Sequence, residues 1–135
     1  MNSWEGHLFN PDPGAYLPHR HPFLLLDRIL SLEPGVSAVG RQQLTGSASP
    51  HLPFFFVEAI AQLGGIAAAR EHGGGGILAA IDRAEFHGIA TAGDTLTISV
   101  RVVKSFGTLH LVEGEISGGG KLLATATVTL KVEKL

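Results

Sequence analysis

The chain of 135 residues contains no cysteine, which excludes disulfide bonds and thiolate chemistry. Charged residues are also scarce, at 16%, and the formal net charge is -2. A sequence with this charge has no basic footprint for binding nucleic acid. So low a charged fraction is also consistent with a surface that another subunit partly covers.

Long hydrophobic runs are missing too. The longest apolar stretch, residues 52–69, is interrupted by Glu58, Gln62 and two glycines, and it is marginal in length for a bilayer. The N-terminus lacks the basic start and apolar core of a signal peptide. We therefore expect a cytoplasmic protein with no membrane segment. Residues 1–135 should form a single domain, with residues 1–18 as an irregular lead-in.

The regular elements are expected to be strands flanking one helix. Alternation of apolar and polar residues with period two is clearest near the C-terminus, as in a sheet with two unlike faces. The expected strands cover residues 22–35, 36–46, 77–86, 95–102, 108–116 and 122–132.

One buried helix is expected in the middle of the chain. Residues from Phe54 to His72 are apolar nearly all round, which indicates a buried helix roughly 28 Å long. Pro53 can start this helix, because a residue in the first turn needs no N–H donor. A single helix with about two strands before it and four after it predicts an α+β fold, in which an antiparallel sheet covers the helix.

The segment "SPHLPFFFVEAIAQLGG" (49–65) contains an acid in otherwise apolar surroundings. Glu58 and Gln62 are four residues apart and therefore share one face of the helix, and His51 lies just upstream. A carboxylate held away from water keeps its proton more readily, which suits a general acid near neutral pH. The structural alternative is that Glu58 reaches solvent near the helix N-terminus, where the dipole favours negative charge.

Three segments carry a resemblance to a known family. "LPHRHPFLLLDRI" (17–29), "VEAIAQ" (57–62) and "AAIDRAEFHGIATAGD" (79–94) resemble the signatures of the β-hydroxyacyl-acyl-carrier-protein dehydratases. Their order and rough spacing match over residues 17–132. The resemblance implies the hotdog fold, in which a curved antiparallel sheet wraps around one long central helix.

The resemblance also implies roles for individual residues. In that family a histidine of a His-Phe-Pro motif removes the proton α to the thioester, and an acid on the helix protonates the departing β-hydroxyl across a dimer interface. Glu58 is then the acid, and His51, in "HLP", is the candidate base. Gln62 becomes a partner of the acid. The resemblance implies neither a metal nor an organic cofactor.

The sequence departs from the family just before the helix. A Gly-x-Pro-x-x-Pro-Gly segment is missing, and the glycine expected to donate its N–H to the thioester oxygen falls on Pro53, which has no N–H. Phe54 or Phe55 must then supply the donor, and we expect both, with Gln62, to contact the substrate. Two alignments stay open. In one, His51 is the base on a shortened loop; in the other, it is an ordinary loop residue.

Three hypotheses about function follow. The first is dehydration of a 3-hydroxyacyl thioester, carried by acyl carrier protein or coenzyme A, by a homodimer that can stack into larger rings. The second is thioester hydrolysis, because hotdog thioesterases use an acid on the same helix to activate water. The third is a non-catalytic subunit that binds an acyl chain or forms a heterodimer with an active relative. Acyl chain length and pathway, whether fatty acid biosynthesis or a specialised product, stay open.

Overall fold

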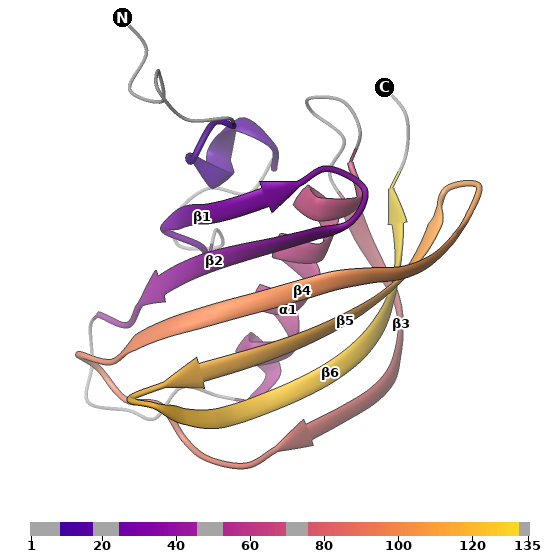
Figure 1. Cartoon of the computed structure of the whole chain (residues 1–135). Coiled ribbons are helices and arrows are strands. Elements are labelled where there is room, and N and C mark those ends of the chain that lie inside the picture. The colour runs from indigo at the N-terminus through magenta and orange to yellow at the C-terminus, as the bar shows by residue number, and fades with distance from the viewer. Residues whose placement is uncertain (1–8, 18–24, 46–52, 70–75, 133–135) are drawn as a thin grey trace, which may run out of the picture.

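The computed structural model describes residues 9–17, 25–45, 53–69 and 76–132. Within these residues one six-stranded antiparallel sheet curves around one α-helix (Figure 1). The elements are a short 3₁₀ turn η1 (Pro13–Ala15), the strands β1 (Arg28–Glu33) and β2 (Ser37–Gln43), the helix α1 (Pro53–Ala68), and the strands β3 (Gly76–Phe86), β4 (Thr95–Phe106), β5 (Leu109–Gly118) and β6 (Lys121–Val132).

The predicted fold class is confirmed, since an antiparallel sheet wraps one long helix. The prediction of a strand over 22–35 is wrong at its start, because β1 begins only at Arg28. Before Arg28 the backbone makes hydrogen bonds outside the sheet: the N–H of Leu25 donates to the Gln62 side chain. The helix begins at Pro53, as predicted.

The predicted end of the helix, His72, is wrong, because α1 ends at Ala68. Its last carbonyl groups lack partners within the helix. One of them, on Ala67, accepts a hydrogen bond of 2.7 Å from the backbone N–H of Gly35, in the turn between β1 and β2. That turn therefore lies at the C-terminal end of α1 and satisfies a carbonyl there.

The strand order β1-β2-β4-β5-β6-β3 leaves β1 and β3 as the two edges of the sheet. The short edge strand β1 is interrupted by an irregularity between Ile29 and Ser31, and Ile29 donates its N–H to the carbonyl of Pro11 at 2.8 Å. The residues before β1 thus lie along this edge. At the other edge, β3 has 11 residues and carries exposed apolar side chains. Long edge strands of this kind are templates for pairing with another chain.

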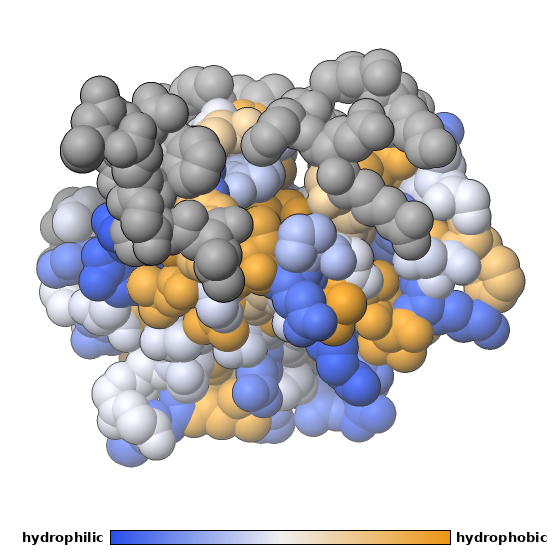
Figure 2. All heavy atoms as spheres, turned by 45° about the horizontal axis from the view of Figure 1, so that its top comes forward, coloured by the Kyte–Doolittle hydropathy of each residue, from blue (hydrophilic) through white to orange (hydrophobic). Residues whose placement is uncertain are grey.

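Figure 2 shows one side of the molecule, on which hydrophobic residues form several groups separated by polar and charged ones. Within the described residues, no helix has the length and apolarity needed to cross a membrane.

Two glycines let the helix lie close against the sheet. A Cβ added to Gly114, on β5, would come within 2.5 Å of the Ile60 side chain on α1. On the helix itself, a Cβ added to Gly64 would come within 2.9 Å of Leu130. Both distances are shorter than those between packed carbon atoms. The helix can therefore lie this close to the sheet only because glycine has no side chain at either position.

We expect Gly114→Ala to destabilise the protein by about 1 to 3 kcal/mol, because the added methyl group overpacks a filled interior. The methyl group would meet Ile60 close to its backbone, where the side chain cannot turn away. Urea unfolding of Gly114→Ala, Ile60→Ala and the double variant measures the effect. If the clash is the cause, the double variant loses less unfolding free energy than the two single variants lose together.

Candidate active site

Glu58 and Gln62 lie together on one face of α1. Glu58 is partly buried, while Gln62 is only 3% exposed. The Nε2 group of Gln62 donates a hydrogen bond of 3.3 Å to Oε1 of Glu58. The structure thus brings together the predicted acid and its predicted partner, one turn apart on a helix that is otherwise apolar.

A backbone contact fixes the orientation of the Gln62 amide. Its Oε1 atom accepts a hydrogen bond of 3.0 Å from the backbone N–H of Leu25. A backbone N–H can only donate, so the carbonyl oxygen must face Leu25 and the amino group must face Glu58. The segment before β1 therefore holds Gln62 as a donor toward the carboxylate. Sequence reasoning missed Leu25, because a backbone group 37 residues away leaves no signal in residue type.

The three phenylalanines at the start of α1 have different surroundings. Phe56 is 1% exposed and stacks on Phe86 of β3, with ring centroids 6.4 Å apart and planes at 28°. Phe54 is 61% exposed, and its ring meets that of Phe55 edge-on at 5.8 Å. Phe56 therefore belongs to the core, whereas Phe54 and Phe55 lie where a substrate or a second subunit could reach them.

One predicted residue falls outside the described part of the chain: His51, the predicted base. Among the residues that the structure does describe, histidines and carboxylates do not gather into a group of three that could hold a metal ion.

A hollow of about 480 Å³ lies on the outer face of the sheet, away from α1. It is lined by small polar side chains such as Ser99 and Thr125 and by charged ones such as Arg101 and Glu113. Arg101 and Glu113 form an exposed ion pair at 2.7 Å, across β4 and β5. Sites for apolar ligands are mostly enclosed and apolar, so this polar hollow does not suit an acyl chain.

Comparisons with known proteins show the family to which the chain belongs. Residues 58–129 match the family model described as the thioesterase superfamily. A 3-hydroxyacyl-(acyl-carrier-protein) dehydratase FabZ from Pelotomaculum thermopropionicum is 37% identical over 129 residues, which cover 86% of this chain and 92% of that protein. This chain belongs to the 3-hydroxyacyl-(acyl-carrier-protein) dehydratase family.

Two further matches fit that assignment. A dehydratase of the same name from Chloroflexus aggregans is 42% identical over 101 residues, covering 65% of this chain and 70% of that protein. Among solved structures, the dehydratase heterocomplex ApeI:P from Xenorhabdus doucetiae matches with a TM-score of 0.81 at 20% identity, covering 93% of both chains. At that identity the match shows the shared hotdog fold.

Two buried glutamines, Gln62 on the helix and Gln42 on the sheet, allow a variant at the site to be compared with a control. We expect Gln62→Leu to lower kcat about tenfold to a hundredfold with little change in KM, because Glu58 loses the donor that orients it. The variant should also lose about 1 to 3 kcal/mol of stability, since the N–H of Leu25 would lose its acceptor. Steady-state kinetics and urea unfolding measure both effects.

Gln42, on β2, is the control. It is buried, and its Oε1 has no hydrogen-bond partner within the described residues. Replacing it with methionine removes an unsatisfied acceptor at nearly constant volume, so Gln42→Met should keep both stability and kcat. Equal losses of kcat in Gln62→Leu and Gln42→Met would show that any change in a buried glutamine disturbs the site.

Proposed function

We propose that this protein is a 3-hydroxyacyl-thioester dehydratase that forms trans-2-enoyl thioesters by acid–base elimination. The observation that carries the proposal is Glu58, a partly buried carboxylate on an apolar helix, with the Gln62 amide turned toward it by the backbone of Leu25. A relative named for this activity is 37% identical over 86% of the chain, which supports the same reaction here.

In the proposed reaction a base removes the proton from the carbon α to the thioester. The electrons of that C–H bond form the C=C double bond, and the β-hydroxyl leaves as water after taking a proton from Glu58. Gln62 holds the carboxylate while its proton is transferred. After the elimination the base holds the proton from the α carbon, and Glu58 has lost one. Release of a proton from the base to solvent and uptake of one by Glu58 return both groups to their starting states, so the enzyme is unchanged after each turnover.

His51 is the proposed base, on the shortened loop before α1. The negative charge that builds on the thioester oxygen needs backbone donors, and the N–H groups in the first turn of a helix point toward an anion placed at its N-terminus. Because α1 starts at Pro53, which has no N–H, the first amide of the helix belongs to Phe54. Phe54 and Phe55 are therefore the proposed oxyanion donors.

We propose that the active form is a homodimer joined along the free edge of β3. Ile77, Ile81 and Phe86 of this strand are 61%, 49% and 44% exposed. Phe86 also stacks on Phe56 in the first turns of α1, so the edge lies beside the start of the helix. A second subunit on this edge would cover apolar side chains and close the site from the outside. The thioester would be carried by acyl carrier protein or coenzyme A.

The experiment presents 3-hydroxybutyryl thioesters of both carriers to the purified protein. Formation of the enoyl thioester is followed by its ultraviolet absorbance, and release of free thiol is followed by a colorimetric thiol reagent. The proposal expects enoyl formation without thiol release. Free thiol without enoyl product would establish a thioesterase. A folded dimer that forms neither product from either carrier would favour the non-catalytic subunit.

A further inference from the structure

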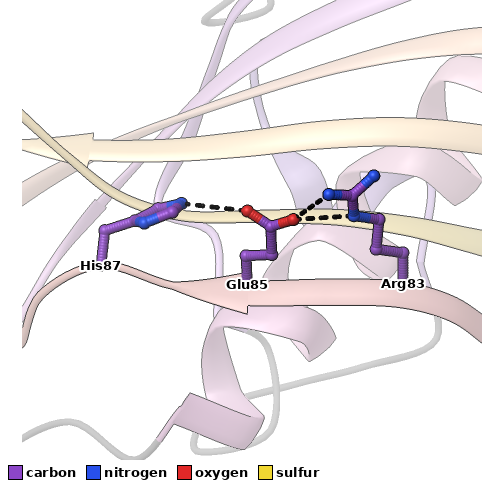
Figure 3. A network of polar contacts seen from close by, with 3 residues as sticks. All are labelled: Arg83, Glu85 and His87. Carbon is purple, nitrogen blue, oxygen red and sulfur yellow. Dashed lines mark hydrogen bonds and ion pairs between the residues drawn. The ribbon is translucent and has the colours of Figure 1, made fainter.

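The carboxylate of Glu85, which lines the hollow on the outer face of the sheet, bonds to other side chains. Nε of Arg83 donates a hydrogen bond of 2.7 Å to Oε1 of Glu85, and Nε2 of His87 lies 3.7 Å from the other carboxylate oxygen. Figure 3 shows the three side chains in a row along β3. All three are substantially exposed, so these pairs add little stability. The carboxylate of Asp27 differs, because it bonds to the backbone of another strand.

Asp27 lies just before β1, where the chain enters the sheet. The first opposed pair of β1 and β2 is Arg28 with Arg41, but β2 continues to Gln43. Oδ2 of Asp27 accepts a hydrogen bond of 2.5 Å from the backbone N–H of Gln43. The N–H of Asp27 donates to the carbonyl of Arg41 at 2.8 Å. The carboxylate therefore takes the place of the strand carbonyl that β1 does not supply at this point.

The segment that Asp27 ties to β2 reaches the helix two residues upstream. Leu26, between the two contacts, is 2% exposed and belongs to the core. The N–H of Leu25 donates a hydrogen bond of 3.0 Å to Oε1 of Gln62, and Nε2 of Gln62 donates one of 3.3 Å to Glu58. Two residues of extended chain span only about 7 Å, so the position of Asp27 restricts the position of Leu25.

We propose that Asp27 is a positioning residue for the dehydration. Its carboxylate holds the segment before β1 in place, so that the N–H of Leu25 turns the amino group of Gln62 toward Glu58. The proposal rests on the proposed function and adds to it a residue that does not touch the substrate. Without the carboxylate, the segment has one hydrogen bond fewer to β2, and Leu25 can move away from Gln62. The amide can then turn over and present its oxygen to Glu58, where it cannot donate.

Other aspartates that bond to the backbone act over shorter spans. Oδ1 of Asp12 accepts a hydrogen bond of 2.9 Å from the N–H of Gly14, two residues away. Oδ2 of Asp94 accepts one of 2.9 Å from Thr91, three residues away. The contact of Asp27 spans 16 residues and joins two segments instead of closing one turn. Asp12 therefore provides a matched control, since its loss removes the same kind of hydrogen bond without changing how Leu25 is held.

Kinetics of crotonyl thioester hydration test the role of Asp27. We expect Asp27→Ala to lower kcat about tenfold and to leave KM within about twofold, because the site is displaced but the acyl contacts remain. Asp12→Ala should keep kcat within about twofold. Asp27→Asn keeps an acceptor oxygen for the N–H of Gln43, so its kcat should stay within about threefold of the wild type.

A double-mutant cycle with Gln62→Leu shows whether Asp27 acts through Gln62. If it does, adding Asp27→Ala to Gln62→Leu should change kcat by less than about twofold, because the amide that Asp27 helps to orient is already gone. A further tenfold loss in the Gln62→Leu background would overturn the proposal, since Asp27 would then act by another route or by general destabilisation.

Amide proton exchange measured by NMR reads the same contact without any activity. The N–H of Leu25 should exchange at least about tenfold faster in Asp27→Ala than in the wild type, and at the wild-type rate in Asp12→Ala. If Asp27→Ala does not fold, Asp27→Glu, which moves the carboxylate outward by one methylene group, replaces it in both experiments. Unchanged exchange at Leu25 in a folded variant would contradict the proposal.

The two experiments also separate this proposal from the proposed function. A wild type that hydrates crotonyl thioesters, together with variants that show no coupling between Asp27 and Gln62, removes the role of Asp27 and leaves the proposed function standing. A folded wild type that is inert removes the proposed function, and with it the role of Asp27 in catalysis, whatever the exchange rate at Leu25.

Discussion

Replacing Glu58 with glutamine is expected to lower the rate of crotonyl thioester hydration by about 10²- to 10⁴-fold, the usual contribution of a positioned general acid or base. The amide of glutamine nearly matches the carboxyl group in shape, but it has no acidic proton to deliver to the β-hydroxyl. KM should change little, because the acyl chain still has the same apolar surroundings. Initial rates measured by loss of enoyl absorbance give the effect.

The Glu58→Gln variant should remain as stable as the wild type to within about 0.5 kcal/mol, because the new side chain can still accept a hydrogen bond from Gln62. This separates loss of chemistry from loss of folding. A well-folded Glu58→Gln variant with more than a third of the wild-type rate would exclude Glu58 as the acid.

Phe56→Ala is expected to cost about 3 to 5 kcal/mol of unfolding free energy, the range for deleting a buried aromatic ring. Phe56 is 1% exposed, and its ring stacks on Phe86 of β3. Removing it would leave a cavity between the start of α1 and the edge strand. Because this cavity lies beside the proposed dimer interface, dimerisation should weaken as well. Guanidinium unfolding and sedimentation measure the two effects.

Phe106→Ala is the matched control, since it deletes the same side chain from an exposed position. Phe106 is 65% exposed at the tip of the β4–β5 hairpin, where the Nζ atom of Lys104 lies 4.7 Å from its ring centroid. Losing an exposed cation–π contact of this kind costs about 0.5 to 1 kcal/mol. A loss for Phe56→Ala no larger than that for Phe106→Ala would show that the first turns of α1 are not part of the core.

The fold was predictable because its signals are local. Strand alternation in β4 and β6 has period two, and the single apolar helix beginning at Pro53 separates two strands from four. The ends of elements depend on distant contacts instead. The carbonyl of Ala67, at the end of α1, accepts a hydrogen bond from Gly35, which is far away in the chain. The local pattern of residues 54–72 carries no sign of this contact, so it predicted a helix that is too long.

The candidate site was predictable only in part. The four-residue spacing of Glu58 and Gln62 places them on one helical face, and the structure brings them into hydrogen-bond contact. The Leu25 N–H that orients Gln62 has no signature in residue type, because every residue except proline carries one.

The most direct test of the central claim is hydration of crotonyl thioester by the wild-type protein in deuterium oxide, with the product analysed by mass spectrometry. Elimination run in reverse adds a hydroxyl group at C3 and one deuteron at C2, and leaves the thioester intact. We predict a 3-hydroxybutyryl thioester that keeps one deuterium at C2 after return to ordinary water. Crotonate without deuterium, accompanied by free thiol, would contradict the account. So would a folded dimer that returns the crotonyl thioester unchanged.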